Sequence, residues 1–401
     1  MSAQTPGRVE FVALMAMLVA TVAFSIDAML PAMPRIGQEL TPDALNRAQL
    51  IITSFILGLG VGTFFTGPLS DSFGRKRVIL WGAAVYMAGA ALAAMAPTLE
   101  LILAARVLQG LGAATARVVP LAIIRDLYSG REMARIVSFV MMVFTLAPAV
   151  APLVGSGIIA LTGWRGIFAS FLIFATITSI WLTLRLAEPL PAEARRPFRI
   201  KALIEALRAV LAPRVVRISI AVQTLCLTTL FSSISSIQQL FEVTFDRADQ
   251  FPLWFFMMAI CAGTGSLLNA ALVMRLGMRR MISVTLGLQI GFTALVLGLF
   301  LVGLPEGLRF PVYLVWQTTI FFQAALTLGN INALAMEPLG HVAGMAASVV
   351  GALATVGSVI LTIPVGLAFD GTPLPLLTGV LLAVCVARLL MTRLERAEEY
   401  A

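Results

Sequence analysis

The chain has 401 residues, of which 59% are hydrophobic and only 12% are charged, and its formal net charge is +8. Soluble domains carry roughly 25% charged residues, so this composition excludes an ordinary soluble protein and indicates an integral membrane protein. The basic residues lie in short segments between apolar runs, which argues against nucleic acid as a partner. One histidine and three cysteines form no spacing suited to a metal, so we expect no metal, no cofactor and no enzymatic activity.

The apolar runs predict an all-α membrane protein with twelve transmembrane helices in two six-helix bundles. Each run is about long enough to span a bilayer and does not alternate, which favours helices over a barrel. The first run is too long for a signal peptide and is expected to be retained. The predicted helices cover residues 10–33, 47–69, 78–97, 99–124, 133–161, 165–187, 214–241, 250–275, 279–303, 309–336, 341–369 and 374–393.

The order of the runs predicts two bundles, 1–187 and 214–401, joined by a cytoplasmic linker over 188–213. The linker begins with a proline-rich stretch, and its residues 199–211 form an amphipathic helix expected on the inner leaflet. If both termini are cytoplasmic, most basic residues fall on the cytoplasmic side. Residues 276–280 weakly resemble residues 73–77, which suggests that the two halves of the chain are structural repeats.

Asp27 is the one acidic residue that we place clearly within a predicted span. A carboxylate inside a bilayer is costly unless it is protonated or paired, so a functional role is the default interpretation. The alternative is a helix-end carboxylate that is already in water. We interpret Asp27 as a group that takes up and releases protons.

The segment 67–77, Gly-Pro-Leu-Ser-Asp-Ser-Phe-Gly-Arg-Lys-Arg, is expected to form a tight polar hairpin between the second and third helices. Gly67 and Gly74 would permit a close turn, and the basic triplet that starts at Arg75 is typical of the cytoplasmic side. On charge alone, a turn that only sets membrane topology would explain it equally well.

The fourth predicted helix carries a stripe of polar and small residues on one face: Arg106, Gln109, Gly110, Ala113 and Arg117. Arg106 lies at about the depth of Asp27 and is its expected partner. Arg117 lies roughly 16 Å further inward along the helix. The alternatives are a structural contact of Arg117 with a carbonyl and simple helix packing at the glycine.

Two later features are predicted to serve transport. Pro148, Pro152 and Gly155 should kink the fifth helix, as a bending element or as a fixed kink. In the second half, Gln238, Gln323 and Asn332 are candidates for lining a cavity, although single amides more often bond between helices.

The family resemblance rests on the segments 27–34, 67–77, 106–113, 124–128, 147–155, 332–335 and 341–348. Together they resemble the major facilitator superfamily, and within it the bicyclomycin-resistance (Bcr/CflA) drug-efflux branch. The resemblance implies proton-driven antiport by alternating access, with Asp27 as the protonated residue and Arg106 as its partner. It also implies a cytoplasmic latch of Asp71, Arg75 and Asp126, with Gly67 and Gly74 in its loop.

The resemblance extends to the antiporter motif of that family, which is matched by Pro148, Pro152 and Gly155. Ala147 stands where the motif usually has glycine, which weakens the inference of antiport.

We therefore expect a monomeric efflux transporter of the bacterial inner membrane that exchanges small amphiphilic compounds for protons. Its partners would be the small-molecule substrate, protons and the lipid bilayer. The alternative is an importer or facilitator of a metabolite such as an amino acid or peptide. A membrane sensor or scaffold is disfavoured because the sequence offers no sizeable soluble domain.

Overall fold

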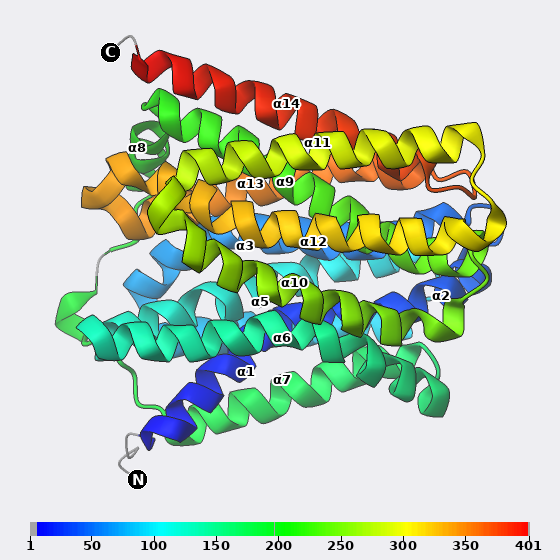
Figure 1. Cartoon of the computed structure of the whole chain (residues 1–401). Helices are drawn as coiled ribbons and strands as arrows, with labels where there is room; N and C mark the ends of the chain where they lie inside the picture. The colour runs from blue at the N-terminus through cyan, green and yellow to red at the C-terminus, as the bar shows by residue number, and fades with distance from the viewer. Residues whose placement is uncertain (1–5, 196, 400–401) are drawn as a thin grey trace. The chain divides into compact units, whose positions relative to one another are not determined.

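The computed structural model describes residues 6–195 and 197–399, and nearly all of them are helical (Figure 1). Within those ranges, twelve helical segments are long and apolar enough to cross a membrane, which confirms the predicted all-α fold. The predicted domains run to both ends of the chain, and residues 1–5, 196, 400 and 401 lie outside this description.

The long helices follow the predicted order with modest shifts at their ends. Their bounds are α1 Arg8–Asp27, α2 Met33–Leu40, α3 Leu50–Phe73, α4 Arg75–Met95, α5 Leu99–Leu127, α6 Gly130–Thr162, α7 Arg165–Arg185, α8 Ile200–Leu211, α9 Arg214–Gln239, α10 Phe251–Leu276, α11 Met278–Val302, α12 Glu306–Met336, α13 Ala343–Leu367 and α14 Leu374–Glu399. Short turns of other helix types include η1 Leu30–Ala32, η2 Leu45–Gln49 and η4 Leu240–Thr244.

The first predicted helix is interrupted near its C-terminal end. The α-helix stops at Asp27, a short η1 turn follows, and α2 resumes at Met33. Pro31 and Pro34 lack backbone N–H groups, so an unbroken helix through this stretch would lose hydrogen bonds. The expectation of one continuous helix over 10–33 was therefore wrong at its end, and Asp27 lies at a helix terminus.

The predicted polar hairpin over 67–77 is almost entirely helical. Gly67 and Pro68 lie inside α3, and Gly74 alone separates α3 from α4. Gly74 has a φ of +100°, a conformation that favours glycine. The turn function expected of Gly67 was therefore wrong, and one glycine makes the whole connection.

Contacts divide the described chain into two compact units. The first unit comprises Met1–Asp43 and Ser54–Glu205. Within it, α1 packs against α5, α6 and α7, and α4 packs against α5 and α7. The backbones of α3 and α5 come very close, because a Cβ atom on Gly110 would lie 2.0 Å from the Phe55 carbonyl oxygen.

The second unit comprises Ala44–Thr53 and Ala206–Ala401. Its helix α9 packs against α12, α13 and α14, while α11 lies beside α12 (Figure 1). The segment Ala44–Thr53 contains η2 and the start of α3, and it packs within this unit, which the predicted domain division did not include.

The predicted amphipathic segment forms α8. Leu203 and Val210 are buried and Leu207 is partly buried, as expected for one apolar face. Ile200 and Ile204 form a second apolar stripe, which is exposed. Contact of α8 with the inner leaflet stays a prediction.

Candidate functional site

Asp27 occupies the last position of α1 and is only 3% exposed. Among the residues that the structure describes, no hydrogen bond or ion pair joins its carboxylate to another group. An ionisable side chain held in a membrane span without a partner is costly, and such residues usually mark functional sites. The location of Asp27 at a helix break also places it next to backbone that is not locked in a regular helix.

The helix α6 meets the chain immediately after Asp27. A Cβ atom on Gly155 would lie 2.3 Å from the carbonyl oxygen of Ala28, so only glycine allows this approach. Pro152 and Gly155 are buried, and Pro148 is partly buried. All three lie within α6, which contains both prolines without ending. The structure therefore brings the predicted kink motif against the segment that carries Asp27.

Arg106 is fully buried in α5, and its guanidinium group is held by several contacts. It donates to the side-chain Oε1 of Gln109 at 2.7 Å and to the backbone carbonyl of Ser25 at 2.9 Å. The guanidinium carbon also lies 4.3 Å from the ring centroid of Phe55, a cation–π distance. The Ser25 hydroxyl lies 2.6 Å from the Tyr86 hydroxyl. This network fastens α5 and α4 to the end of α1.

The expected ion pair between Asp27 and Arg106 is absent from the described residues. Arg106 reaches the carbonyl of Ser25 instead, two residues before Asp27. This hydrogen bond is to the backbone of α1 and not to a side chain, so it does not bring the Asp27 carboxylate into reach. Counting residues along each helix correctly placed Arg106 next to α1, but it did not predict which group of α1 the arginine contacts.

Arg117 lies three helical turns beyond Arg106 on the same face of α5. Its side chain is partly buried. Within residues 6–195 and 197–399, no hydrogen bond, ion pair or ring contact is formed by its guanidinium group. The alternative interpretation, a structural contact with a carbonyl, is therefore not what the structure contains.

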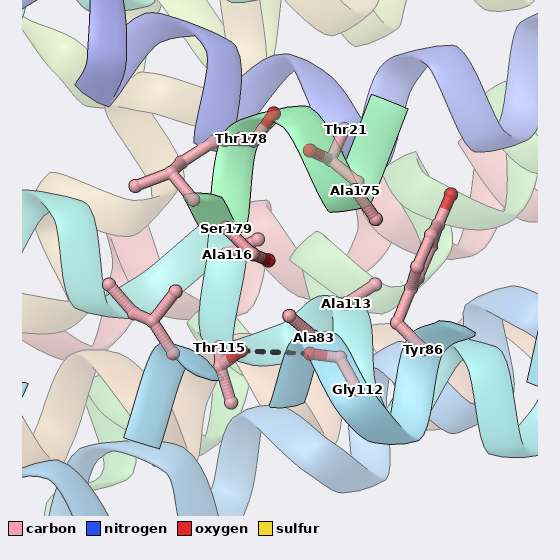
Figure 2. Close-up of a pocket in the computed structure, with 12 residues that line it drawn as sticks. Thr21, Ala83, Tyr86, Gly112, Ala113, Thr115, Ala116, Ala175, Thr178 and Ser179 are labelled. Carbon is pink, nitrogen blue, oxygen red and sulfur yellow. Dashed lines mark hydrogen bonds between the residues drawn. The ribbon is translucent and has the colours of Figure 1, made fainter. Parts of the chain in front are cut away.

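A small cavity lies inside the first unit between α1, α4, α5 and α7 (Figure 2). About 20 Å³ of it is open to the centre of a water molecule, which is room for one water. Thr21, Tyr86 and Thr115 line it, and the Thr115 hydroxyl donates to the Gly112 carbonyl at 2.9 Å. Drug-sized ligands need pockets of roughly 300 Å³ or more, so this cavity is not a substrate site.

Three residues of the predicted latch come together at the end of the first unit where α3 meets α4. Arg75 is 4% exposed and donates from Nε to Asp126 at 2.8 Å. Its Nη1 group donates to Asp71 at 2.5 Å and to the Ser70 hydroxyl at 2.7 Å. One buried guanidinium thus ties α3, α4 and α5 together through two carboxylates.

Glu188, which the sequence reasoning missed, completes this cluster from the start of the linker. Its carboxylate accepts hydrogen bonds from the backbone N–H groups of Arg75 at 2.7 Å and Lys76 at 3.1 Å. These are orphan donors at the N-terminus of α4, where Gly74 provides no capping side chain. The Lys76 ammonium donates to the carbonyls of Thr183 and Leu186 near the end of α7. The sequence around Gly74 contains no pattern that would predict a helix cap from a residue 113 positions later than Arg75.

The second unit contains neutral polar groups rather than charged ones at the positions singled out by sequence. Gln238 and Gln323 are buried, and each has an Oε1 atom without a hydrogen-bond partner in the described part of the chain. Asn332 differs from them because its side chain is exposed. Whether these three line a cavity stays a prediction.

A cluster of side-chain amides within the second unit was not predicted. Asn46 donates to the carbonyl of Phe369 at 2.6 Å and accepts a hydrogen bond from Gln239 at 2.7 Å. Gln49 bonds both Gln239 and Ser236. We call the four residues whose side chains take part, Asn46, Gln49, Ser236 and Gln239, the amide clasp. It joins η2 to the ends of α9 and α13. In the sequence, each of these amides on its own looks like an ordinary loop or helix-end residue.

No group of three or more histidine, cysteine or carboxylate side chains suited to a metal occurs among the described residues.

Comparison with known proteins gives a family match. The family model described as Major Facilitator Superfamily matches residues 14–362. A chloramphenicol resistance protein of Pseudomonas aeruginosa is 34% identical over 148 residues, which are 37% of this chain and 35% of that protein. A bicyclomycin resistance protein homolog of Haemophilus influenzae is 27% identical over 66% of this chain and 67% of that protein. The first of these matches thus spans little more than a third of the relative's length.

The fold has close counterparts among solved structures. A D-xylose–proton symporter superimposes over 95% of this chain and 97% of its own, with a TM-score of 0.73 and 15% sequence identity. At that identity the likeness establishes the fold only.

Proposed function

This chain belongs to the Major Facilitator Superfamily, a family of transporters rather than enzymes, and on that premise we propose that it is a proton-coupled efflux transporter. It exports small amphiphilic compounds in exchange for protons, by alternating access and as a monomer in the bacterial inner membrane. Both termini are cytoplasmic in this proposal. The names of the two relatives above, which refer to drug resistance, support efflux as the direction.

The observation that carries the proposal is the buried, unpartnered carboxyl group of Asp27. A group that is neither ion-paired nor hydrogen-bonded within the described residues is open to exchange of a proton with water when access changes. Because Asp27 ends α1 and lies beside the Gly155 contact of α6, a change in its charge acts on a point where two helices meet closely. Protonated and deprotonated chains then favour different arrangements of the helices.

Arg106 has a positioning role in this proposal. It holds the carbonyl of Ser25 and so fixes the turn of α1 that presents Asp27, without neutralising the carboxylate itself. Its contacts to Gln109 and Phe55 keep the guanidinium in place while Asp27 changes charge.

The cluster of Asp71, Arg75 and Asp126 serves as the cytoplasmic latch in this proposal. Its ion pairs bridge three helices at one end of the first unit. A latch of this kind would stabilise one state of the transport cycle and would be released in the other.

Transport into inverted membrane vesicles tests the proposal. Respiration acidifies the vesicle interior, so an efflux antiporter should accumulate radiolabelled chloramphenicol while protons leave. Asp27→Asn should abolish accumulation against the gradient, and nigericin, which collapses the pH gradient, should have the same effect on the native chain.

The matched control is Asp43→Asn, the same chemical change at an exposed acid, which should accumulate chloramphenicol normally. Uphill accumulation that persists in Asp27→Asn contradicts the coupling role. Accumulation in right-side-out vesicles but not in inverted ones would favour the importer alternative.

A further inference from the structure

Arg117 is a cation in a membrane span for which the described part of the chain provides no counter-ion. Along α5, it lies roughly 15 Å from the inner end of the helix, at Leu127, and further from the outer end, at Leu99. An arginine at such depth is costly for the fold, and such residues normally pair with one another, with carbonyls or with a ligand.

Three acids in the cytoplasmic part of the first unit are engaged by other residues. Asp71 and Asp126 both accept hydrogen bonds from Arg75. Glu10 accepts from Arg185 and from the indole of Trp181. None of these carboxylates is left over as a partner for Arg117.

The two arginines of the α5 stripe therefore differ in kind. Arg106 is fully buried, and its guanidinium contacts the Ser25 carbonyl, the Gln109 amide oxygen and the Phe55 ring. Groups within the fold therefore stabilise its charge. Arg117 is on the same face, is partly buried, and has donors to spare. Its five N–H groups in a planar fork match the geometry of a carboxylate, sulfonate or phosphate.

We propose that Arg117 binds the anionic group of the transported compound, so that this transporter prefers amphiphilic anions to matched neutral compounds. This rests on the proposed transport function and names its substrate class. Lipid phosphates are a poorer fit because they lie at the bilayer surface, whereas Arg117 lies several helical turns inside the span.

The proposal is tested by binding, which needs no proton gradient and so can fail or succeed independently of proton coupling. The full chain is placed in nanodiscs of zwitterionic lipid, which removes anionic lipid as a competitor. Two matched probe pairs are titrated calorimetrically: chloramphenicol succinate against chloramphenicol, and 1-naphthoate against 1-naphthamide. In at least one pair, the native chain should bind the anion more tightly than its neutral partner.

Arg117→Gln should weaken binding of the preferred anion by about tenfold or more, because a charge-assisted hydrogen bond is lost, and should leave the neutral partner nearly unchanged. Arg117→Lys should restore much of the anion affinity. Arg135→Gln, the same change at an exposed arginine, should have little effect on either probe. No anion preference in either pair, or equal losses for anion and neutral probe in Arg117→Gln, would overturn the proposal.

Thermal unfolding separates a ligand-binding role from a structural one. Since Arg117 has no partner in the described residues, Arg117→Gln should unfold at the same temperature as the native chain or higher. A clear loss of stability, together with unchanged selectivity between the probes, would make Arg117 a structural residue and would contradict the assignment.

Discussion

Glu188→Ala should open the first turn of α4 without unfolding the rest of the first unit. The carboxylate of Glu188 accepts from the backbone N–H groups of Arg75 and Lys76, at 2.7 and 3.1 Å. Loss of a side-chain cap costs about 0.5–2 kcal/mol, and loss of a negative charge at a helix N-terminus costs a further ~0.3–1 kcal/mol. The expected local cost is therefore about 1–3 kcal/mol.

Hydrogen exchange followed by mass spectrometry measures this cost directly. Since 1.4 kcal/mol corresponds to a factor of about ten, the first turn of α4 should exchange roughly five- to hundredfold faster in Glu188→Ala. It is followed in a peptide that begins several residues before Arg75, so that the Arg75 and Lys76 amides are retained. Glu188→Gln keeps an acceptor oxygen and should show a smaller increase. Peptides from the middle of α5 should exchange as in the native chain.

The control is Glu193→Ala, which removes an exposed acid of the same linker that forms no hydrogen bond or ion pair within the described residues. It should leave exchange at Arg75 and Lys76 unaltered. Equal acceleration in both variants, or no acceleration in Glu188→Ala, would refute the idea that the linker caps α4.

Two further substitutions test contacts elsewhere in the fold. Gly155→Ala places a Cβ atom 2.3 Å from the Ala28 carbonyl oxygen and should lower the free energy of unfolding by about 1–3 kcal/mol, measured by thermal unfolding. Gly157→Ala, where a Cβ atom would have nothing within 4 Å, should be harmless. Equal effects of the two substitutions would argue against this helix contact. In the amide clasp, a double-mutant cycle of Asn46→Ala and Gln239→Ala should give a coupling free energy of about 0.5–3 kcal/mol, and strictly additive losses would contradict the 2.7 Å hydrogen bond between them.

Sequence reasoning succeeded where the signal is local. Hydropathy located all twelve spans because each must match the thickness of a bilayer. The grouping of Asp71, Arg75 and Asp126 followed from the family resemblance, and the structure joins them by ion pairs. The helical character of Gly67 was missed, because glycine and proline next to polar residues look like a turn even when a helix continues through them.

Contacts between segments that are far apart in the sequence could not be predicted in this way. The cap from Glu188 depends on how the linker returns to α4, and the amide clasp depends on which residues of η2 reach α9 and α13. The Asp27–Arg106 pair failed for a more specific reason. Depth along two helices can be estimated from residue counts, but the rotation that directs Arg106 to the Ser25 carbonyl cannot.

The central claim is that the carboxyl group of Asp27 changes its protonation when substrate binds. Infrared difference spectroscopy, with and without 1-naphthoate, reports this through the carbonyl stretch of a protonated carboxyl group, a range in which the ionised probe does not absorb. The native chain should show a substrate-dependent change in this band that is missing in Asp27→Asn and retained in Asp43→Asn. A spectrum in which substrate binds and the Asp27 band does not change would contradict the account.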